Sequence, residues 1–79
     1  MDEWEEGKQT FVGLVQRIDS SVQVVIPTKP TNSVFLISLT KGPNRKFITL
    51  PEDDIIDLPE NPAVLAKVKK TVQDAVSAL

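Results

Sequence analysis

The amino-acid sequence predicts a mainly β protein of the α+β class, in which one C-terminal helix covers a small antiparallel barrel or curled sheet of four to five strands. Two observations lead to this prediction. Between residues 10 and 58, short runs of β-branched and aromatic residues alternate with turn-forming residues. After Pro62, apolar residues recur at helical spacing, and neither Gly nor Pro interrupts them.

Charge divides the 79-residue chain into segments. Residues 1–6 carry four acids and no base, residues 7–50 carry six bases against Asp19 alone, and residues 51–60 carry five acids. A basic middle is therefore bracketed by two acidic segments. We expect an acidic tail over residues 1–8, with Gly7 as a hinge, followed by one domain over residues 9–79.

The first hairpin is expected from residues 10–18 and 22–26. Both runs are rich in β-branched residues, and a short turn of Asp19, Ser20 and Ser21 separates them. Gly13 then marks a bulge or a tight bend in the first strand.

The second hairpin is expected from residues 33–40 and 45–50. A loop with two prolines precedes it over residues 27–33, because proline lacks a backbone donor and restricts its neighbours. Phe35, Ile37 and Leu39 face one side of the third strand. Two loop lengths fit the turn around Gly42 and Pro43, so the register stays open.

Residues 51–58 have two interpretations. In the preferred one, Pro51 opens a single helical turn and a short fifth strand follows over residues 55–58. In the other, residues 51–57 form one short helix whose acids favour its N-terminus.

The last element is predicted as an amphipathic helix over residues 62–78. Asn61 is a good N-cap, and Pro62 suits the first helical position. One stripe carries the apolar side chains Leu65, Val68, Val72, Ala75, Val76 and Leu79.

Residues 9–58 resemble a small SH3-like barrel in architecture, since they combine several short strands with a late single turn and a final short strand. No diagnostic motif accompanies this resemblance. It implies no function, because such barrels host many unrelated binding roles.

Missing residue types exclude several function classes. The chain has no Cys, His or Tyr, which excludes disulfide scaffolds, zinc and iron–sulfur sites, and imidazole bases. We therefore expect no enzyme activity, no cofactor and no metal. The acids Glu52, Asp53, Asp54 and Asp57 are interpreted as a solvated turn, with Mg²⁺ or Ca²⁺ binding as the weaker alternative.

The sequence shows no targeting or membrane segment. The N-terminus is acidic, the reverse of a secretory signal, and the longest apolar run covers only residues 34–37. We expect a cytoplasmic protein with no membrane partner.

We expect a small non-catalytic protein-interaction or accessory module with a protein partner. Trp is a common interface residue, although Trp4 is also expected to fold back and close the core. The heptad-like spacing of the last helix leaves a monomer or a helix-mediated homodimer open. The candidate partner-binding residues are Trp4, Lys41, Arg45, Lys46, Leu65, Val68 and Val72.

The alternative is a nucleic-acid-binding module that uses the basic segment over residues 8–46. An isoelectric point near 4.9 argues against affinity for phosphate backbones. A core this small is also expected to need all three phenylalanines. An exposed aromatic among converging bases would favour this alternative.

Overall fold

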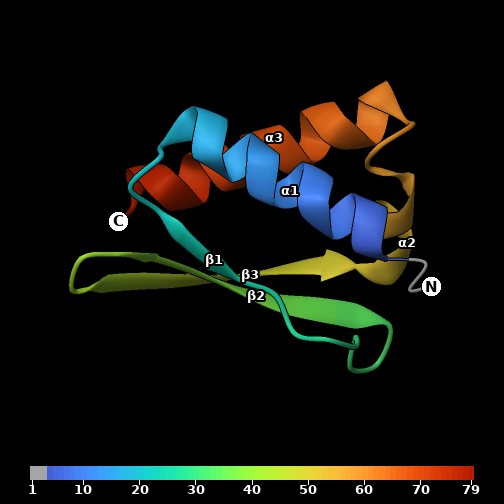
Figure 1. The fold of residues 1–79 in the computed structure, drawn as a ribbon, viewed down its shortest axis with the longest axis horizontal. Helices are drawn as coiled ribbons and strands as arrows, with labels where there is room; N and C mark the ends of the chain where they lie inside the picture. The colour runs from blue at the N-terminus through green and yellow to red at the C-terminus, as the bar shows by residue number, and fades with distance from the viewer. Residues whose placement is uncertain (1–3) are drawn as a thin grey trace.

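The structure, a computed structural model, describes residues 4–79. Three helices and three strands follow one another in the order α-β-β-β-α-α, and Figure 1 shows α1 and α3 side by side on one face of the sheet. The elements are α1 (Glu5–Ile18), β1 (Gln23–Val25), β2 (Val34–Lys41), β3 (Asn44–Pro51), α2 (Glu52–Asp57) and α3 (Pro62–Ser77).

The sheet is antiparallel with the strand order β1-β2-β3. The predicted second hairpin is confirmed as β2 and β3, and Lys41 pairs with Asn44. Its loop therefore has two residues, Gly42 and Pro43. Gly42 has a φ of +59°, which only glycine adopts without strain, and a proline after it fits the type II′ turn typical of hairpins. This turn fixes the register that the sequence left open.

The predicted strand over residues 10–18 is wrong, because this segment belongs to helix α1. Its apolar residues Phe11, Leu14, Val15 and Ile18 are spaced i, i+3, i+4 and i+7, which is the helical period. Phe11 and Val15 are completely buried. Packing of this apolar stripe outweighs the β propensity of the individual residues.

The barrel of four to five strands is also wrong, and the resemblance to an SH3-like barrel fails with it. The described residues form an open sheet of three strands, too few to close on itself. The preferred short strand over residues 55–58 is replaced by helix α2, the other interpretation of that segment. Ile55 lies in this helix and Leu58 is its C-cap residue. The two are three residues apart, so they lie on one side of the helix, and both are buried.

The C-terminal helix is confirmed. The Asn61 side chain accepts hydrogen bonds from the backbone amides of Ala63 and Val64, at 3.0 and 3.3 Å, and Pro62 occupies the first helical position. One core lies between the helices and the sheet. Its buried residues are Phe11, Val15, Val22, Phe35, Ile37, Leu39, Ile48, Leu50, Ile55, Leu58, Val68, Val72 and Ala75.

Candidate functional site

The second face of the sheet carries large apolar side chains that are exposed. Neither a helix nor a strand among residues 4–79 covers this face, which lies opposite α1 and α3 in Figure 1. We call it the open face. Its residues are Gln23, Val25, Val34, Leu36, Ser38, Thr40, Arg45, Phe47, Thr49 and Pro51.

Val25, Leu36 and Phe47 form one patch at the centre of the open face. Their exposed fractions are 62%, 56% and 54%. Val25 and Phe47 both pair with Ser38, from opposite sides, and Leu36 lies diagonally from Phe47. Diagonal neighbours on one face are within reach of an aromatic side chain. The three side chains therefore form one surface, unlike the single exposed hydrophobic residues that are common on proteins.

The edges of the sheet are less suited to binding than its open face. β1 has only three residues, and β3 carries the charged residues Arg45 and Lys46 next to its first residue, Asn44. Short edge strands and edge charges both oppose pairing with a strand of another chain. Both edges of the sheet therefore oppose the addition of a further strand.

The segregation of charge along the sequence becomes a separation in space. The hairpin turn lies at one end of the longest dimension of 33 Å, and α2 lies with the start of α1 at the other end (Figure 1). We call these the basic tip, with Lys41, Arg45 and Lys46, and the acidic end, with Glu5, Glu6, Glu52, Asp53, Asp54 and Asp57. Asp54 of the acidic end forms an ion pair with Lys67 of α3, whose ammonium nitrogen lies 2.8 Å from Asp54 Oδ2.

The three predicted binding residues of the hairpin do not share one face. Arg45 pairs with Thr40 and lies on the open face, whereas Lys46 pairs with the buried Leu39 and lies on the helix side. Lys41 also lies on the helix side, where its ammonium group is 2.6 Å from Asp19 Oδ2. Arg45 is therefore the one predicted cation of the basic tip that borders the apolar patch.

Trp4 packs against the core, as the fold-back alternative predicted. Its ring meets that of Phe35 edge-on, with 5.7 Å between centroids. The Lys8 ammonium group lies 5.4 Å from the Phe35 ring centroid and donates a hydrogen bond to the Thr28 carbonyl oxygen at 3.0 Å. Gly7 is buried inside α1, so the expected hinge at this residue is wrong. Trp4 is accordingly part of the folded domain.

The three predicted binding residues of the last helix are directed toward the rest of the protein. Val68 and Val72 are completely buried, and Leu65 is partly buried against the core. The apolar stripe of α3 is thus packed against the sheet and α1. These residues do not add to an exposed surface.

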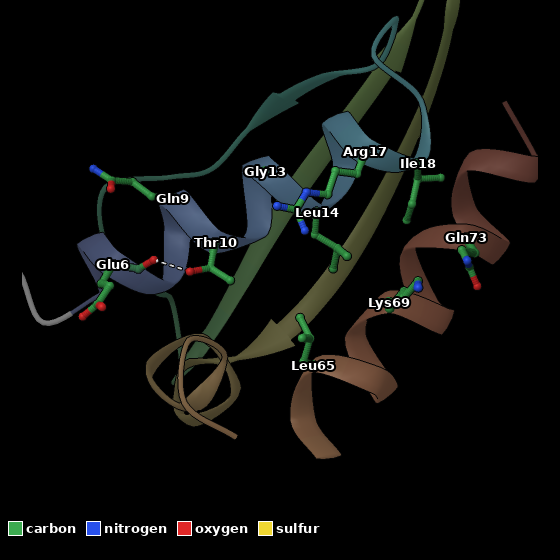
Figure 2. Close-up of a pocket in the computed structure, with 10 residues that line it drawn as sticks. All are labelled: Glu6, Gln9, Thr10, Gly13, Leu14, Arg17, Ile18, Leu65, Lys69 and Gln73. Carbon is green, nitrogen blue, oxygen red and sulfur yellow. Dashed lines mark hydrogen bonds between the residues drawn. The ribbon is translucent and has the colours of Figure 1, made fainter. Parts of the chain in front are cut away.

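A groove of about 800 Å³ lies between α1 and α3, and Figure 2 shows the side chains along it. Leu14, Ile18 and Leu65 supply its apolar part, and Arg17 and Lys69 its cations. Figure 2 also shows the hydrogen bond that the Thr10 hydroxyl group donates to the Glu6 carbonyl oxygen, with 2.9 Å between the two oxygens. The remaining lining residues are Glu6, Gln9, Gly13 and Gln73. Within residues 4–79, no buried polar side chain points into the groove to identify an occupant.

The fold leaves residues 4–79 with neither a cluster of metal-ligating side chains nor a membrane-spanning helix. No three acidic side chains in this range are grouped closely enough to hold a metal ion. None of the helices in the same range is both long and apolar enough to cross a membrane.

The sequence reasoning missed the apolar patch. It assigned Phe47 to the core, but Phe47 pairs with Ser38, whereas the next residue, Ile48, pairs with the buried Ile37. A two-residue turn at Gly42 and Pro43 was the signal that could have placed Phe47 correctly, because it fixes which residues of β3 share a face with Leu36.

Comparison with known proteins yields no relative. No family model matches the chain, and no curated protein or solved structure is significantly similar to it.

Proposed function

We propose that this protein is a non-catalytic protein-interaction module that binds its partner through the open face of its sheet. One observation carries the proposal: Val25, Leu36 and Phe47 are each more than half exposed and lie together at the centre of that face. Contiguous exposed apolar surface of this kind marks interaction sites on monomeric proteins. A partner that covers the patch removes it from water.

The size of the patch sets the strength of binding. Full burial of a Val, Leu or Phe side chain contributes about 1.5–3 kcal/mol, so covering three half-exposed side chains contributes about 2.5–5 kcal/mol. Loss of translational and rotational freedom costs a similar amount or more. Polar contacts around the patch, for which Gln23, Arg45 and Thr49 are available, must therefore contribute to binding. A weak, reversible interaction follows.

A pair of matched variants tests the proposal. Leu36→Ser/Phe47→Ser removes two of the three side chains of the patch. The control Val12→Ser removes an exposed apolar side chain of α1, in the helical layer on the other side of the sheet. Each immobilised protein is used to retain binding proteins from an extract of the native host. We expect a partner that the wild type and Val12→Ser retain and that the patch variant loses. Equal retention by all three proteins would contradict the proposal.

A single-stranded nucleic acid is the second candidate, and one observation favours it. Phe47 is exposed and lies two residues from Arg45 on the same face, the combination on which bases stack. Against it, four of the other five bases of residues 8–46 lie elsewhere: Lys41 and Lys46 lie on the helix side, Lys8 lies against Trp4, and Arg17 lines the groove between α1 and α3. Among the bases of the strands, Arg45 alone is therefore available on the open face to hold a phosphate backbone.

A titration separates the two candidates. ¹⁵N-labelled protein is titrated with random single- and double-stranded oligonucleotides at low salt and at about 200 mM salt, because counterion release makes phosphate contacts salt-dependent. We expect no shifts at Arg45 or Phe47. Chemical-shift changes at these residues that weaken steeply with salt would show that the open face binds a nucleic acid rather than a protein.

A further inference from the structure

We infer that the groove between α1 and α3 is a second binding site, which takes an amphipathic helix of another protein with carboxylates beside its apolar stripe. This inference goes beyond the proposed function, because the groove is lined by α1 and α3 alone, and these helices cover the face of the sheet opposite the open face. Three properties of the groove lead to it: unfilled space at Gly13, two cations and an apolar floor.

Gly13 leaves space in the groove that the chain does not fill. A Cβ atom built on Gly13 would meet nothing within 4 Å. The residue lies inside α1 and its φ is not positive, so neither a turn nor a close contact within residues 4–79 requires glycine here. Glycine at such a position lowers the stability of a helix relative to alanine. The space at Gly13 is therefore available to a group from outside the chain.

The other glycine of α1 shows what such a space permits. A Cβ atom on Gly7 would overlap the carbonyl group of Ile55, so the missing side chain lets the backbone of α2 contact α1. Glycine allows a second backbone to approach closely in this way. At Gly13 the same opening faces the groove. A helix of a partner can therefore approach α1 there as closely as α2 approaches it at Gly7.

Two cations border the groove from its two sides, Arg17 on α1 and Lys69 on α3. Within residues 4–79, the structure gives neither of them an ion pair or a side-chain hydrogen bond. Figure 2 shows the Leu14 side chain between them and Glu6 at the far end of the groove. Glu6 is eleven residues from Arg17 on α1, about 16 Å along the helix. Carboxylates of a partner are therefore favoured at the Arg17 end.

The shape of the groove fits a helix. Leu14, Ile18 and Leu65 are partly buried against the core and line the groove with the remainder of their side chains. Residues 6–18 of α1 border it, which corresponds to about 18 Å or between three and four helical turns. Helices pack by fitting the ridges of one into the grooves of another. An apolar stripe with i, i+3, i+4 and i+7 spacing is the usual way in which a helix binds such a surface.

A small molecule fits the groove less well than a helix. Small-ligand sites fix their ligand through a few precisely placed polar groups in a concave, largely enclosed pocket. Within residues 4–79, the groove has no buried polar side chain, and the Thr10 hydroxyl group is already bonded to the Glu6 carbonyl oxygen. The exposed cations instead suit carboxylates on the surface of a macromolecule. This is the reason for preferring a helix of another protein.

Synthetic peptides and the ¹⁵N-labelled full chain test the inference. The acidic probe has about 18 residues, long enough to form a helix alone, with leucine at i, i+3, i+4 and i+7. Glutamate borders this stripe in one half of the peptide and glutamine in the other half. The basic probe has lysine in place of each glutamate. A third probe has the composition of the acidic one in an order that destroys the helical spacing.

We expect the acidic probe to shift the amide signals of Gly13, Leu14, Leu65 and Lys69, with a dissociation constant below about 1 mM. The basic and the reordered probes are expected to bind at least about tenfold more weakly. The Leu36→Ser/Phe47→Ser variant should bind the acidic probe as the wild type does, because the open face lies on the other side of the sheet. This result separates the groove from the site of the proposed function.

Filling the space at Gly13 tests the groove without loss of the fold. Gly13→Gln introduces a good helix former whose Cβ has room, so the protein should stay folded by circular dichroism. The longer side chain occupies the groove, and the affinity for the acidic probe should fall about tenfold. The matched control is Val12→Gln, at the neighbouring residue of α1, which does not line the groove. It should bind as the wild type does.

Charge reversal tests the role of the two cations. Arg17→Glu/Lys69→Glu should reverse the preference, so that the basic probe binds more tightly than the acidic one. The matched control Lys46→Glu/Lys70→Glu makes the same change of net charge at residues outside the groove. It should keep the wild-type preference.

Four results would overturn the inference. They are no shifts with the acidic probe at about 1 mM, shifts confined to the open face, equal binding of the acidic and basic probes by the wild type, and equal binding of the acidic and reordered probes. The first result means that the groove takes no helix of this chemistry. The second means that the open face is the only site for such a helix.

Discussion

Gly7 of α1 lies directly against the backbone of Ile55 in α2. A Cβ atom built on Gly7 would lie 1.9 Å from the Ile55 carbonyl oxygen and 2.7 Å from its carbon, so no larger residue fits at this position. This contact places the acids that begin α1 beside those of α2. The acidic end of the molecule therefore results from the close approach of two helices.

Two glycines of α1 are expected to respond oppositely to alanine. Gly7→Ala forces the backbones of α1 and α2 apart and should destabilise the protein by about 2–3 kcal/mol. Gly13→Ala places its Cβ in open space, where no atom lies within 4 Å, and should stabilise the helix by about 0.5–1 kcal/mol. Urea denaturation of both variants measures the two changes. Equal effects would show that α1 and α2 do not approach as described.

Adjacent residues of β2 test which face of the sheet is packed. Ile37 is completely buried and Leu36 is 56% exposed. We expect Ile37→Ala to cost about 2–5 kcal/mol of unfolding free energy and Leu36→Ala less than about 1 kcal/mol in dilute solution. Thermal denaturation at low protein concentration is the measurement. A similar cost for both substitutions would mean that both faces are covered.

Trp4 is expected to contribute to stability from the start of the domain. It packs edge-on against Phe35, and truncation of a fully buried Trp costs about 3–5 kcal/mol, so Trp4→Ala should cost about 2 kcal/mol for this partly buried residue. Trp4→Phe keeps an aromatic ring and should cost less. The single Trp makes fluorescence a direct reporter of unfolding in the wild type, and circular dichroism serves for the variants. An unchanged melting temperature for Trp4→Ala would exclude a packing role.

Asp19 is expected to make the stability of the fold depend on pH in the acidic range. The Lys41 side chain, hydrogen-bonded to its carboxylate, and the Ser21 amide lower the pKa of Asp19 below its ordinary value of 3.8. A lowered folded-state pKa means that the stabilisation is complete above the unfolded-state pKa and is lost as the pH falls through the folded value. We therefore expect this contribution to disappear only below about pH 4.

Carboxyl ¹³C NMR titration measures this pKa directly. In Lys41→Met, the pKa of Asp19 should rise toward its ordinary value, because the largest cause of the shift is removed. The wild-type protein, titrated under the same conditions, is the control. An unchanged Asp19 titration in Lys41→Met would show that the ion pair is absent in solution.

Local signals identified the elements whose boundaries depend on a few residues. Asn61 and Pro62 determine the start of α3, and Gly42 and Pro43 determine the hairpin turn. In each case a single backbone requirement selects the residue type, a capping oxygen at Asn61 and a positive φ at Gly42. Such requirements can be recognised without knowledge of the rest of the fold.

The errors arose where tertiary packing decides the structure. Residues 10–18 combine β-branched residues with helical spacing, and contact with the sheet and α2 selects the helix. Phe47 was assigned to the core because a small core needs large residues, yet its position in the register leaves it exposed. The candidate site follows from that register. It could not be predicted while two turn lengths were left open.

Site-specific photo-crosslinking in the native host tests the central claim, that the open face is the contact surface, most directly. A photoreactive phenylalanine analogue is placed at position 47 on the open face or at position 12 on α1, where Val12 is exposed. We predict crosslinked products from position 47, to a second copy or to another protein, and a loss of these products when Leu36→Ser is added. Products from position 12 with none from position 47 would contradict the account.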